Sequence, residues 1–209
     1  MLVLGLSLAT PLPTLARAQA HAEAAVPTAR KLVLVVGDSL SAEYGLARGS
    51  GWVALLDARL AQKKVTTSVV NASISGDTTS GGRSRLPQLL RLHRPAVVIL
   101  ELGGNDALRG LPLTSTGDNL TQMARSAKAA GAKVLVLGMQ VPPNYGRQYG
   151  DRFVAVFGSV AKAEGSTLVP FMLRGVADEM FQADRIHPTA AAHPIILDNV
   201  WPALEPLLR

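Results

Sequence analysis

The chain has 209 residues, of which 48% are hydrophobic, and a formal net charge of +6 at pH 7. This length and composition predict one domain with a sizeable core. The basic residues are scattered and only 4% of residues are aromatic, so the composition argues against a nucleic-acid partner. The absence of cysteine excludes disulfides, thiolate catalysis and cysteine metal sites.

Residues 1–20 are expected to form a cleavable signal peptide. An apolar run extends from Leu2 to Leu8, and small residues offer cleavage sites after Ala18 or Ala20. A membrane anchor is a weaker alternative because the run is shorter than the ~20 residues of a spanning helix; a disordered apolar tail is the third. No Lys or Arg precedes Arg17, which favours a true start further upstream. The prediction is a periplasmic or secreted protein.

Residues 21–30 are alanine-rich and indicate a linker, so the domain is expected over residues 31–209. Short runs rich in β-branched residues predict five strands: Leu32 to Val36, Thr67 to Asn71, Val97 to Glu101, Lys133 to Met139 and, more weakly, Thr167 to Val169. Apolar residues at helical spacing predict the helices: Trp52 to Gln62, Leu86 to Leu92, Asn119 to Ala130, Arg152 to Ala163 and Ala190 to Leu208, the last broken by Pro194 and Pro202.

This alternation of apolar strands with helices predicts an α/β fold, a parallel sheet covered by helices on both faces. Ligands bind such sheets at the carboxyl ends of the strands. Three predicted strands end there in polar, glycine-rich segments: Gly37-Asp38-Ser39-Leu40, Asn71 to Thr78, and Glu101 to Asp106.

Ser39 is a candidate nucleophile because it follows a buried strand at a sharp turn. Near the C-terminus, the three-residue spacing of Asp184 and His187 lets the carboxylate accept a hydrogen bond from Nδ1 of the ring. Three groups could then bind an oxyanion: the Ser39 N–H, the Gly76 backbone and the Asn105 side-chain amide. Each segment alone is equally well explained as a turn or exposed loop, so the hydrolase interpretation depends on their combination.

These blocks make the chain similar to the SGNH, or GDSL, hydrolases over residues 32–204, and most of all to the branch of bacterial periplasmic acyl-CoA thioesterases, lysophospholipases and arylesterases. Pro143-Asn144-Tyr145-Gly146 belongs to the closer match. The resemblance implies a flavodoxin-like three-layer α/β/α sandwich with a five-stranded parallel sheet, and neither cofactor nor metal. It implies Ser39, His187 and Asp184 as catalytic residues, an oxyanion hole of Ser39, Gly76 and Asn105, and a substrate pocket that includes Asp38, Thr78, Asn144, Tyr145 and Ile186.

The chain departs from that branch in three places. Residues 79–83 are expected to form a glycine-rich loop, Glu43 stands where a small residue is expected, and His193 is a second histidine after the catalytic block. His193 and the two tryptophans, Trp52 and Trp201, are expected to be structural.

The sequence therefore predicts a serine esterase or thioesterase that acts through an acyl-enzyme on fatty acyl thioesters, lysophospholipids, or aryl or short-to-medium-chain esters. We also expect a monomer with transient contact to membrane lipid. A carbohydrate acetylesterase of the same family is the main alternative. A weaker alternative is a metal-dependent phosphoesterase that uses Asp38, Asp106, Asp184 and His187. Another is a non-catalytic binding module, which is not supported because the chain lacks the glycine motifs of nucleotide-binding sites.

Overall fold

The computed structural model describes residues 31–209; the expected signal peptide and linker, residues 1–30, lie outside the described residues. Five parallel strands form one sheet in the order β2-β1-β3-β4-β5. The strands are β1 (Lys31–Gly37), β2 (Thr67–Asn71), β3 (Val97–Glu101), β4 (Lys133–Leu137) and β5 (Thr167–Val169). This is the flavodoxin-like strand order, in which β2 lies on one side of β1 and the chain then crosses to the other side to add β3, β4 and β5.

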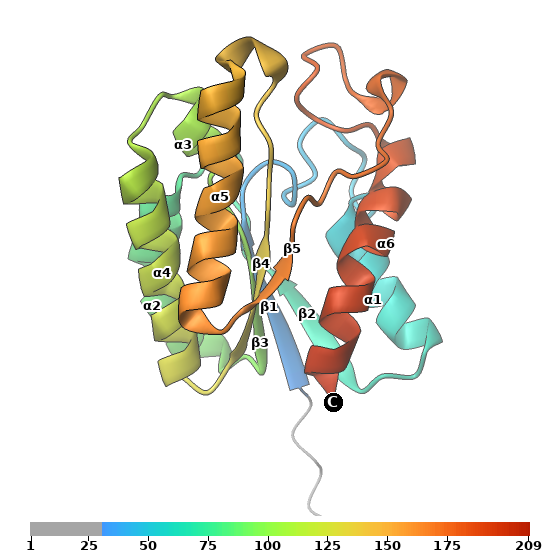
Figure 1. Ribbon diagram of the computed structural model, residues 1–209. Helices are drawn as coiled ribbons and strands as arrows, with labels where there is room; N and C mark the ends of the chain where they lie inside the picture. Colours follow the sequence, from blue (N-terminus) through green and yellow to red (C-terminus); the bar gives the residue numbers. More distant parts are fainter. Residues whose placement is uncertain (1–30) are drawn as a thin grey trace, which may run out of the picture.

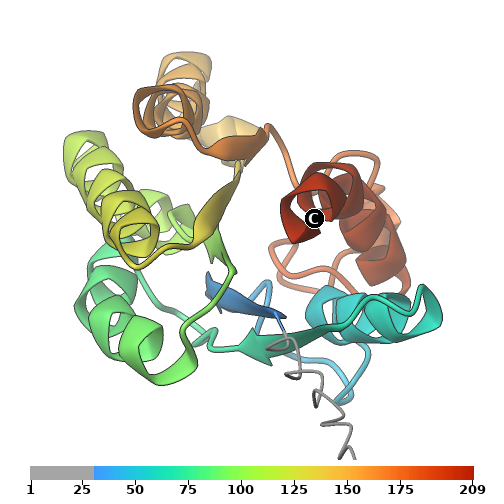
Figure 2. The ribbon, with the colours of Figure 1, turned by 90° about the horizontal axis from the view of Figure 1, so that it is seen from below.

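Helices cover both faces of the sheet, as Figures 1 and 2 show. On one face α2 (Thr79–His93), α4 (Leu113–Ala129) and α5 (Arg147–Glu164) lie side by side, and on the other α1 (Trp52–Gln62) packs against α6 (His193–Leu204). Short helical segments complete the chain: α3 (Gly104–Leu108), η1 (Pro143–Tyr145), η2 (Asp178–Met180), η3 (Ala190–Ala192) and η4 (Glu205–Leu208). The predicted three-layer α/β/α sandwich is thus confirmed.

The apolar strands form the centre of the core because both of their faces are covered by helices. Every residue of β3 is buried, as are Val33 to Gly37 of β1. On one side of the sheet Phe153 and Phe157 pack edge to face with ring centroids 5.1 Å apart. Strand bounds predicted from β-branched runs agree closely with the structure, although β4 ends at Leu137 rather than Met139.

Trp52 and His193 are buried structural residues that join α1 to α6. The backbone N–H of Trp52, at the first position of α1, donates to Nδ1 of His193 over 2.9 Å. Burial lowers the pKa of His193, which favours the neutral ring that can accept this hydrogen bond. Trp201 is 9% exposed and packs in the same core.

The expectation of a glycine-rich loop over residues 79–83 is wrong, because these residues form the first turn of α2. Thr78 caps this helix by accepting a hydrogen bond from the Gly81 N–H over 3.3 Å. A Cβ on Gly82 would lie 2.2 Å from Cδ1 of Leu102, so the glycine lets the helix approach the core closely. The segment is therefore a packed helix start.

Helix starts are where the structure differs most from the sequence expectation. The first turns of α2, α4 and α5 are mostly polar, so no apolar period marks them. The helices begin at Thr79, Leu113 and Arg147 rather than at Leu86, Asn119 and Arg152.

The predicted C-terminal helix over residues 190–208 is divided into η3, α6 and η4, but neither Pro194 nor Pro202 marks a break, because α6 runs unbroken from His193 to Leu204. Pro194 lies in the first turn, where a missing N–H costs no intrahelical hydrogen bond, and Pro202 lies in the last turn. Among the described residues, none of the helices is both long and apolar enough to cross a membrane.

Candidate active site

Three loops gather at the carboxyl edge of the sheet, around the point where strand order reverses. The loop after β1 carries Ser39, the loop after β2 carries Gly76, and the segment after β3 carries Asn105 on α3. The N–H of Ile74 donates to the Gly37 carbonyl over 3.0 Å, which fastens the first two loops to each other. Three adjacent parallel strands therefore bring these sequence-distant groups to the same edge of the sheet.

Ser39, His187 and Asp184 form a continuous hydrogen-bonded chain. The Oγ of Ser39 lies 2.8 Å from Nε2 of His187, and Nδ1 of the same ring lies 2.7 Å from Oδ2 of Asp184. Ser39 and His187 are half-buried, and the Asp184 side chain is 38% exposed. A proton can thus pass from the serine hydroxyl to the imidazole, with the carboxylate holding the opposite ring nitrogen.

The turn from Asp184 to His187 fixes the carboxylate as well as the ring. Oδ1 of Asp184 accepts hydrogen bonds from the backbone N–H groups of Ile186 (2.9 Å) and His187 (3.0 Å). The N–H of His187, reinforced by its ring and by the Ile186 N–H, lowers the pKa of Asp184 to about 2. Asp184 is therefore an ionised acceptor at neutral pH.

His187 is held on its other sides by residues that sequence reasoning missed. The ring of Tyr44 lies against the imidazole with centroids 4.3 Å apart. Gln182 donates through Nε2 to the carbonyls of Tyr44 (2.9 Å) and Pro188 (3.1 Å), and its N–H donates to the His187 carbonyl over 2.7 Å. Gln182 thereby ties the loop after β1 to the segment that bears the histidine.

The unexpected Glu43 shapes the same loop. It adopts a left-handed φ of 60°, and its carboxylate accepts hydrogen bonds from the N–H groups of Gly49 and Gly51. Glu43 thus closes the loop before α1 through hydrogen bonds to backbone N–H groups.

Asp38 lies beneath the serine rather than in a pocket. It is 2% exposed, and its carboxylate accepts hydrogen bonds from the Leu40 N–H and the Asn105 side-chain amide, each over 3.0 Å. Burial raises the pKa of Asp38 to about 6, although these hydrogen bonds oppose the rise, so the group is mostly ionised at pH 7. Asp38 therefore holds the serine turn, and it also orients Asn105.

The three predicted oxyanion donors lie in the segments that follow β1, β2 and β3, at the same edge of the sheet. Asn105 gives one amide hydrogen to Asp38 and keeps a second. Within residues 31–209, the N–H groups of Ser39 and Gly76 donate to no protein oxygen. Gly76 has a φ of +79°, a backbone conformation that favours glycine. Space is not the reason for glycine here, because an added Cβ would come no nearer than 3.7 Å to another residue. All three donors are free to bind a ligand oxygen.

Arg85 on α2 is a third residue that sequence reasoning missed. Its Nε forms an ion pair of 2.8 Å with Asp77, next to Gly76. Its two terminal nitrogens donate to the carbonyls of Ala72 and Gly37, the latter over 3.3 Å. One guanidinium therefore links the loop after β2 to the start of the serine turn.

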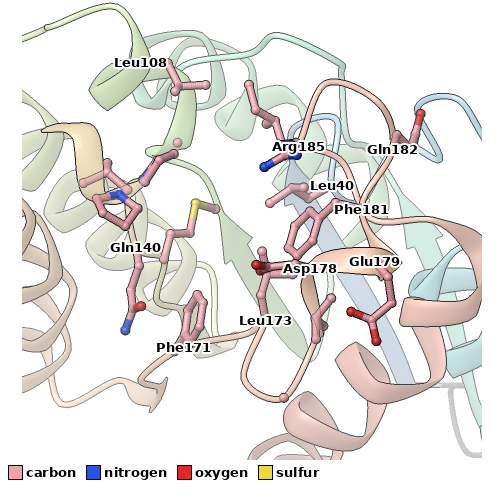
Figure 3. Close-up of a pocket in the computed structure, with 18 of the residues that line it drawn as sticks. Leu40, Leu108, Gln140, Phe171, Leu173, Asp178, Glu179, Phe181, Gln182 and Arg185 are labelled. Atoms are coloured by element: carbon pink, nitrogen blue, oxygen red, sulfur yellow. The ribbon is translucent and has the colours of Figure 1, made fainter.

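A cavity of about 1130 Å³ opens beside the serine turn, between the segments that follow β4 and β5. In Figure 3, Gln140 faces Phe181, Asp178 and Leu173 across the cavity, and Leu40 and Arg185 lie toward one end. Most of the lining is apolar, and it includes Met139, Val141, Phe171, Leu173, Phe181 and Ile186. The cavity can enclose an apolar chain attached to a group at Ser39.

Of the five predicted pocket residues, only Ile186 lines this cavity. Asp38 lies under the turn and Thr78 caps α2. Asn144 is exposed on η1, and Tyr145 stacks on Tyr149 with centroids 6.0 Å apart. The cavity wall is formed instead by the preceding residues, 139–143.

Asp106 does not join the other acidic groups in a metal site. It accepts hydrogen bonds from the N–H (2.8 Å) and the hydroxyl of Thr79, which fixes the start of α2. In the part of the chain that the structure describes, no three His, Asp or Glu side chains gather closely enough to hold a metal ion.

The fold and this hydrogen-bonded chain define the class of protein as a serine-type hydrolase with a flavodoxin-like sheet. The sequence profile of the GDSL-like lipase/acylhydrolase family matches residues 35–195, and the chain belongs to that family. It is an enzyme that hydrolyses carboxylic esters or thioesters by means of a serine, histidine and aspartate triad, and its substrates are small-molecule esters.

Relatives named as hydrolases match this chain over most of their length. Esterase TesA of Pseudomonas aeruginosa is 56% identical over 182 residues, which are 86% of this chain and 90% of the relative. Thioesterase 1/protease 1/lysophospholipase L1 of Escherichia coli K12 is 43% identical over 179 residues, 85% of each chain. A crystal structure of TesA superimposes with a TM-score of 0.84 at 55% identity, covering 85% of this chain and 99% of the other.

Proposed function

We propose that Ser39 is the nucleophile, His187 the general base and Asp184 the group that orients His187. The observation that carries the proposal is the unbroken chain of hydrogen bonds of 2.8 Å and 2.7 Å from Ser39 Oγ through the imidazole to Asp184. Ionised Asp184 holds the proton of the neutral ring on Nδ1, and Nε2 is then the acceptor that faces the serine.

Hydrolysis then proceeds through an acyl-enzyme in two stages. Ser39 Oγ bonds to the carbonyl carbon while its proton moves to His187 Nε2, and the carbonyl electron pair moves onto the oxygen. Collapse of this oxyanion expels the alcohol or thiol, which takes the proton from His187. Water then attacks the acyl group, His187 takes its proton, and the carboxylic acid leaves as the proton returns to Ser39.

The oxyanion hole of this mechanism consists of the Ser39 and Gly76 N–H groups and the free amide hydrogen of Asn105. Asn105→Ala should lower kcat by roughly 10²-fold, because one donor to the developing negative charge is removed. The KM for p-nitrophenyl octanoate should change much less, since the donor acts mainly in the transition state. Asn144→Ala, on exposed η1, is the matched control. An unchanged kcat for Asn105→Ala would remove this residue from the hole.

The proposed substrates are acyl thioesters, lysophospholipids, and aryl or short-to-medium-chain esters. Two findings support this range: the large, mainly apolar cavity beside Ser39, and relatives named esterase, thioesterase and lysophospholipase. In this proposal Ile186 contacts the acyl chain, while the other four predicted pocket residues act elsewhere. Faster hydrolysis of octanoyl than of acetyl esters is expected, and the opposite order would favour a carbohydrate acetylesterase.

We also propose that the enzyme is exported to the periplasm after removal of residues 1–20, and that it acts as a monomer. The apolar segment at Leu2 to Leu8 and the small residues around Ala18 and Ala20 support export. The intact mass of the exported protein, and its mass in solution by light scattering, test the two parts separately.

We further propose transient contact with an anionic lipid surface through the apolar rim, defined as Tyr44, Ile74, Leu108, Leu111 and Ile186. These are five of the seven exposed large apolar side chains in residues 31–209. Leu108 ends α3 and the other four lie on loops, all at the carboxyl edge of the sheet. The exposed cations Arg109 and Arg185 lie among them, which favours anionic over neutral lipid.

Joint replacement of Ile74 and Leu111 with serine should weaken binding to phosphatidylglycerol vesicles roughly tenfold, because apolar surface is lost from the contact. Cosedimentation measures this, and hydrolysis of a soluble aryl ester should be unchanged. Leu92→Ser is the control, since Leu92 is 71% exposed at the end of α2, away from this edge. Equal binding by the rim variant and the control would contradict the proposal.

A further inference from the structure

Glu101 is a buried carboxyl group to which the mechanism above gives no role. It ends β3, where it pairs in register with Gly37 of β1, and it is 0% exposed. None of the ion pairs among residues 31–209 includes it, and its Oε1 has no hydrogen-bond partner there. Burying a carboxyl group without a nearby cation costs folding free energy, so a buried residue of this kind is a candidate for a functional role.

The other oxygen of Glu101 holds both sides of the serine turn. Oε2 accepts one hydrogen bond from the backbone N–H of Asp38, over 3.2 Å, and a second from the hydroxyl of Ser41, over 2.6 Å. These two donors flank Ser39 in the sequence, one residue before and two residues after it. A single acceptor atom therefore fixes the path of the backbone that carries the nucleophile.

The surroundings of Glu101 are adapted to this arrangement. A Cβ on Gly37 would lie 2.5 Å from Oε2 of Glu101 and 2.9 Å from Oγ of Ser41, so the carboxyl group occupies space that the glycine leaves. Trp52, which is fully buried, donates through Nε1 to the Ser41 hydroxyl over 3.2 Å. The Ser41 hydroxyl thus accepts a hydrogen bond from Trp52 and donates its own hydrogen to Glu101.

We propose that Glu101 is a positioning residue for ester hydrolysis, a buried acceptor that keeps Ser39 Oγ within reach of His187 Nε2. The proposal rests on the proposed role of Ser39 as nucleophile. Burial, together with the neighbouring Asp38 carboxylate, raises the pKa of Glu101 well above its usual range. The two hydrogen bonds to Oε2 give Glu101 the role of a hydrogen-bond acceptor for the serine turn.

A pair of variants separates the acceptor from the charge and from simple packing. Glu101→Gln keeps a carbonyl oxygen that can accept both hydrogen bonds, whereas Glu101→Leu has similar bulk and no acceptor. We expect kcat to stay within about threefold of wild type for the glutamine variant and to fall up to roughly 10²-fold for the leucine variant, with KM little changed, because misplacing a reacting group costs rate of this order.

Glu164→Leu is the control for loss of a buried glutamate, because Glu164 is 9% exposed at the distant end of α5. If Glu101→Leu fails to fold, Ser41→Ala removes one of the two donors and should still lower kcat with an unchanged KM. A wild-type kcat in folded Glu101→Leu or in Ser41→Ala overturns the proposal, as does a glutamine variant as slow as the leucine variant.

The rate at which a fluorophosphonate labels Ser39 tests the role of Glu101 separately from the role of Ser39 as nucleophile. Labelling should be slow in Glu101→Leu and near normal in Glu101→Gln. If wild-type protein is not labelled at Ser39, the proposed nucleophile is wrong. If wild type is labelled and the leucine variant is labelled equally fast, only the role of Glu101 is wrong.

Discussion

Replacing Ser39 with alanine should lower ester hydrolysis by about 10⁶-fold, the effect of losing the nucleophile in a serine hydrolase. The variant should still fold, because the Ser39 hydroxyl forms its one hydrogen bond among the described residues with His187. Turnover of p-nitrophenyl octanoate measures the loss, and circular dichroism with thermal unfolding checks the fold.

Ser80→Ala is the matched control for this experiment. Ser80 is exposed in the first turn of α2 and forms no side-chain hydrogen bond within residues 31–209, so its loss should leave turnover unchanged. Substantial turnover by folded Ser39→Ala would mean that another group attacks the ester.

Asp184→Asn should lower kcat by up to roughly 10⁴-fold, as in serine-protease triads. The neutral amide can still accept the two backbone hydrogen bonds through its oxygen, but its NH₂ group then faces Nδ1. His187 would turn its unprotonated Nδ1 toward that NH₂ group and carry its proton on Nε2, where it cannot accept the proton of Ser39. Steady-state kinetics on the same ester measure this loss.

Asp198→Asn controls for the removal of a carboxylate, because Asp198 on α6 forms an ion pair with Arg59 on α1 and its side chain is 66% exposed. It should retain wild-type kcat. Near-normal kcat in Asp184→Asn as well would show that Asp184 does not orient the ring.

The strands were the more predictable part of the fold. Buried strands such as Val97–Glu101 consist of β-branched and apolar residues up to a final polar residue, so their limits are visible in the sequence. Helix starts were harder, because Thr79 and its neighbours are small and polar and become helical through the Thr78 cap and the Asp106 carboxylate. Those contacts depend on the tertiary fold and leave no periodic signal.

A similar distinction holds for the candidate site. Ser39, Asp184 and His187 lie in short segments whose spacing itself suggests their chemistry. Gln182 and Arg85 were missed because they act on backbone carbonyls of distant loops: Gln182 lies 138 residues from Tyr44 and Arg85 lies 48 from Gly37. Any polar side chain could make such contacts, so residue type alone does not reveal them.

The cavity wall was misplaced for a related reason. Asn144 and Tyr145 stood out as turn residues, yet the wall consists of residues 139–143 together with apolar residues such as Phe171 and Phe181. Apolar residues in loops resemble core residues in a sequence. Only the arrangement of the two segments after β4 and β5 makes them line a cavity.

The most direct test of the account is to treat the purified mature protein with a fluorophosphonate probe and to locate the modified peptide by mass spectrometry. The account predicts stoichiometric labelling at Ser39 and no labelling in Ser39→Ala. Folded wild-type protein that takes no label, or takes it at another residue, would contradict the assignment of Ser39 as the activated nucleophile.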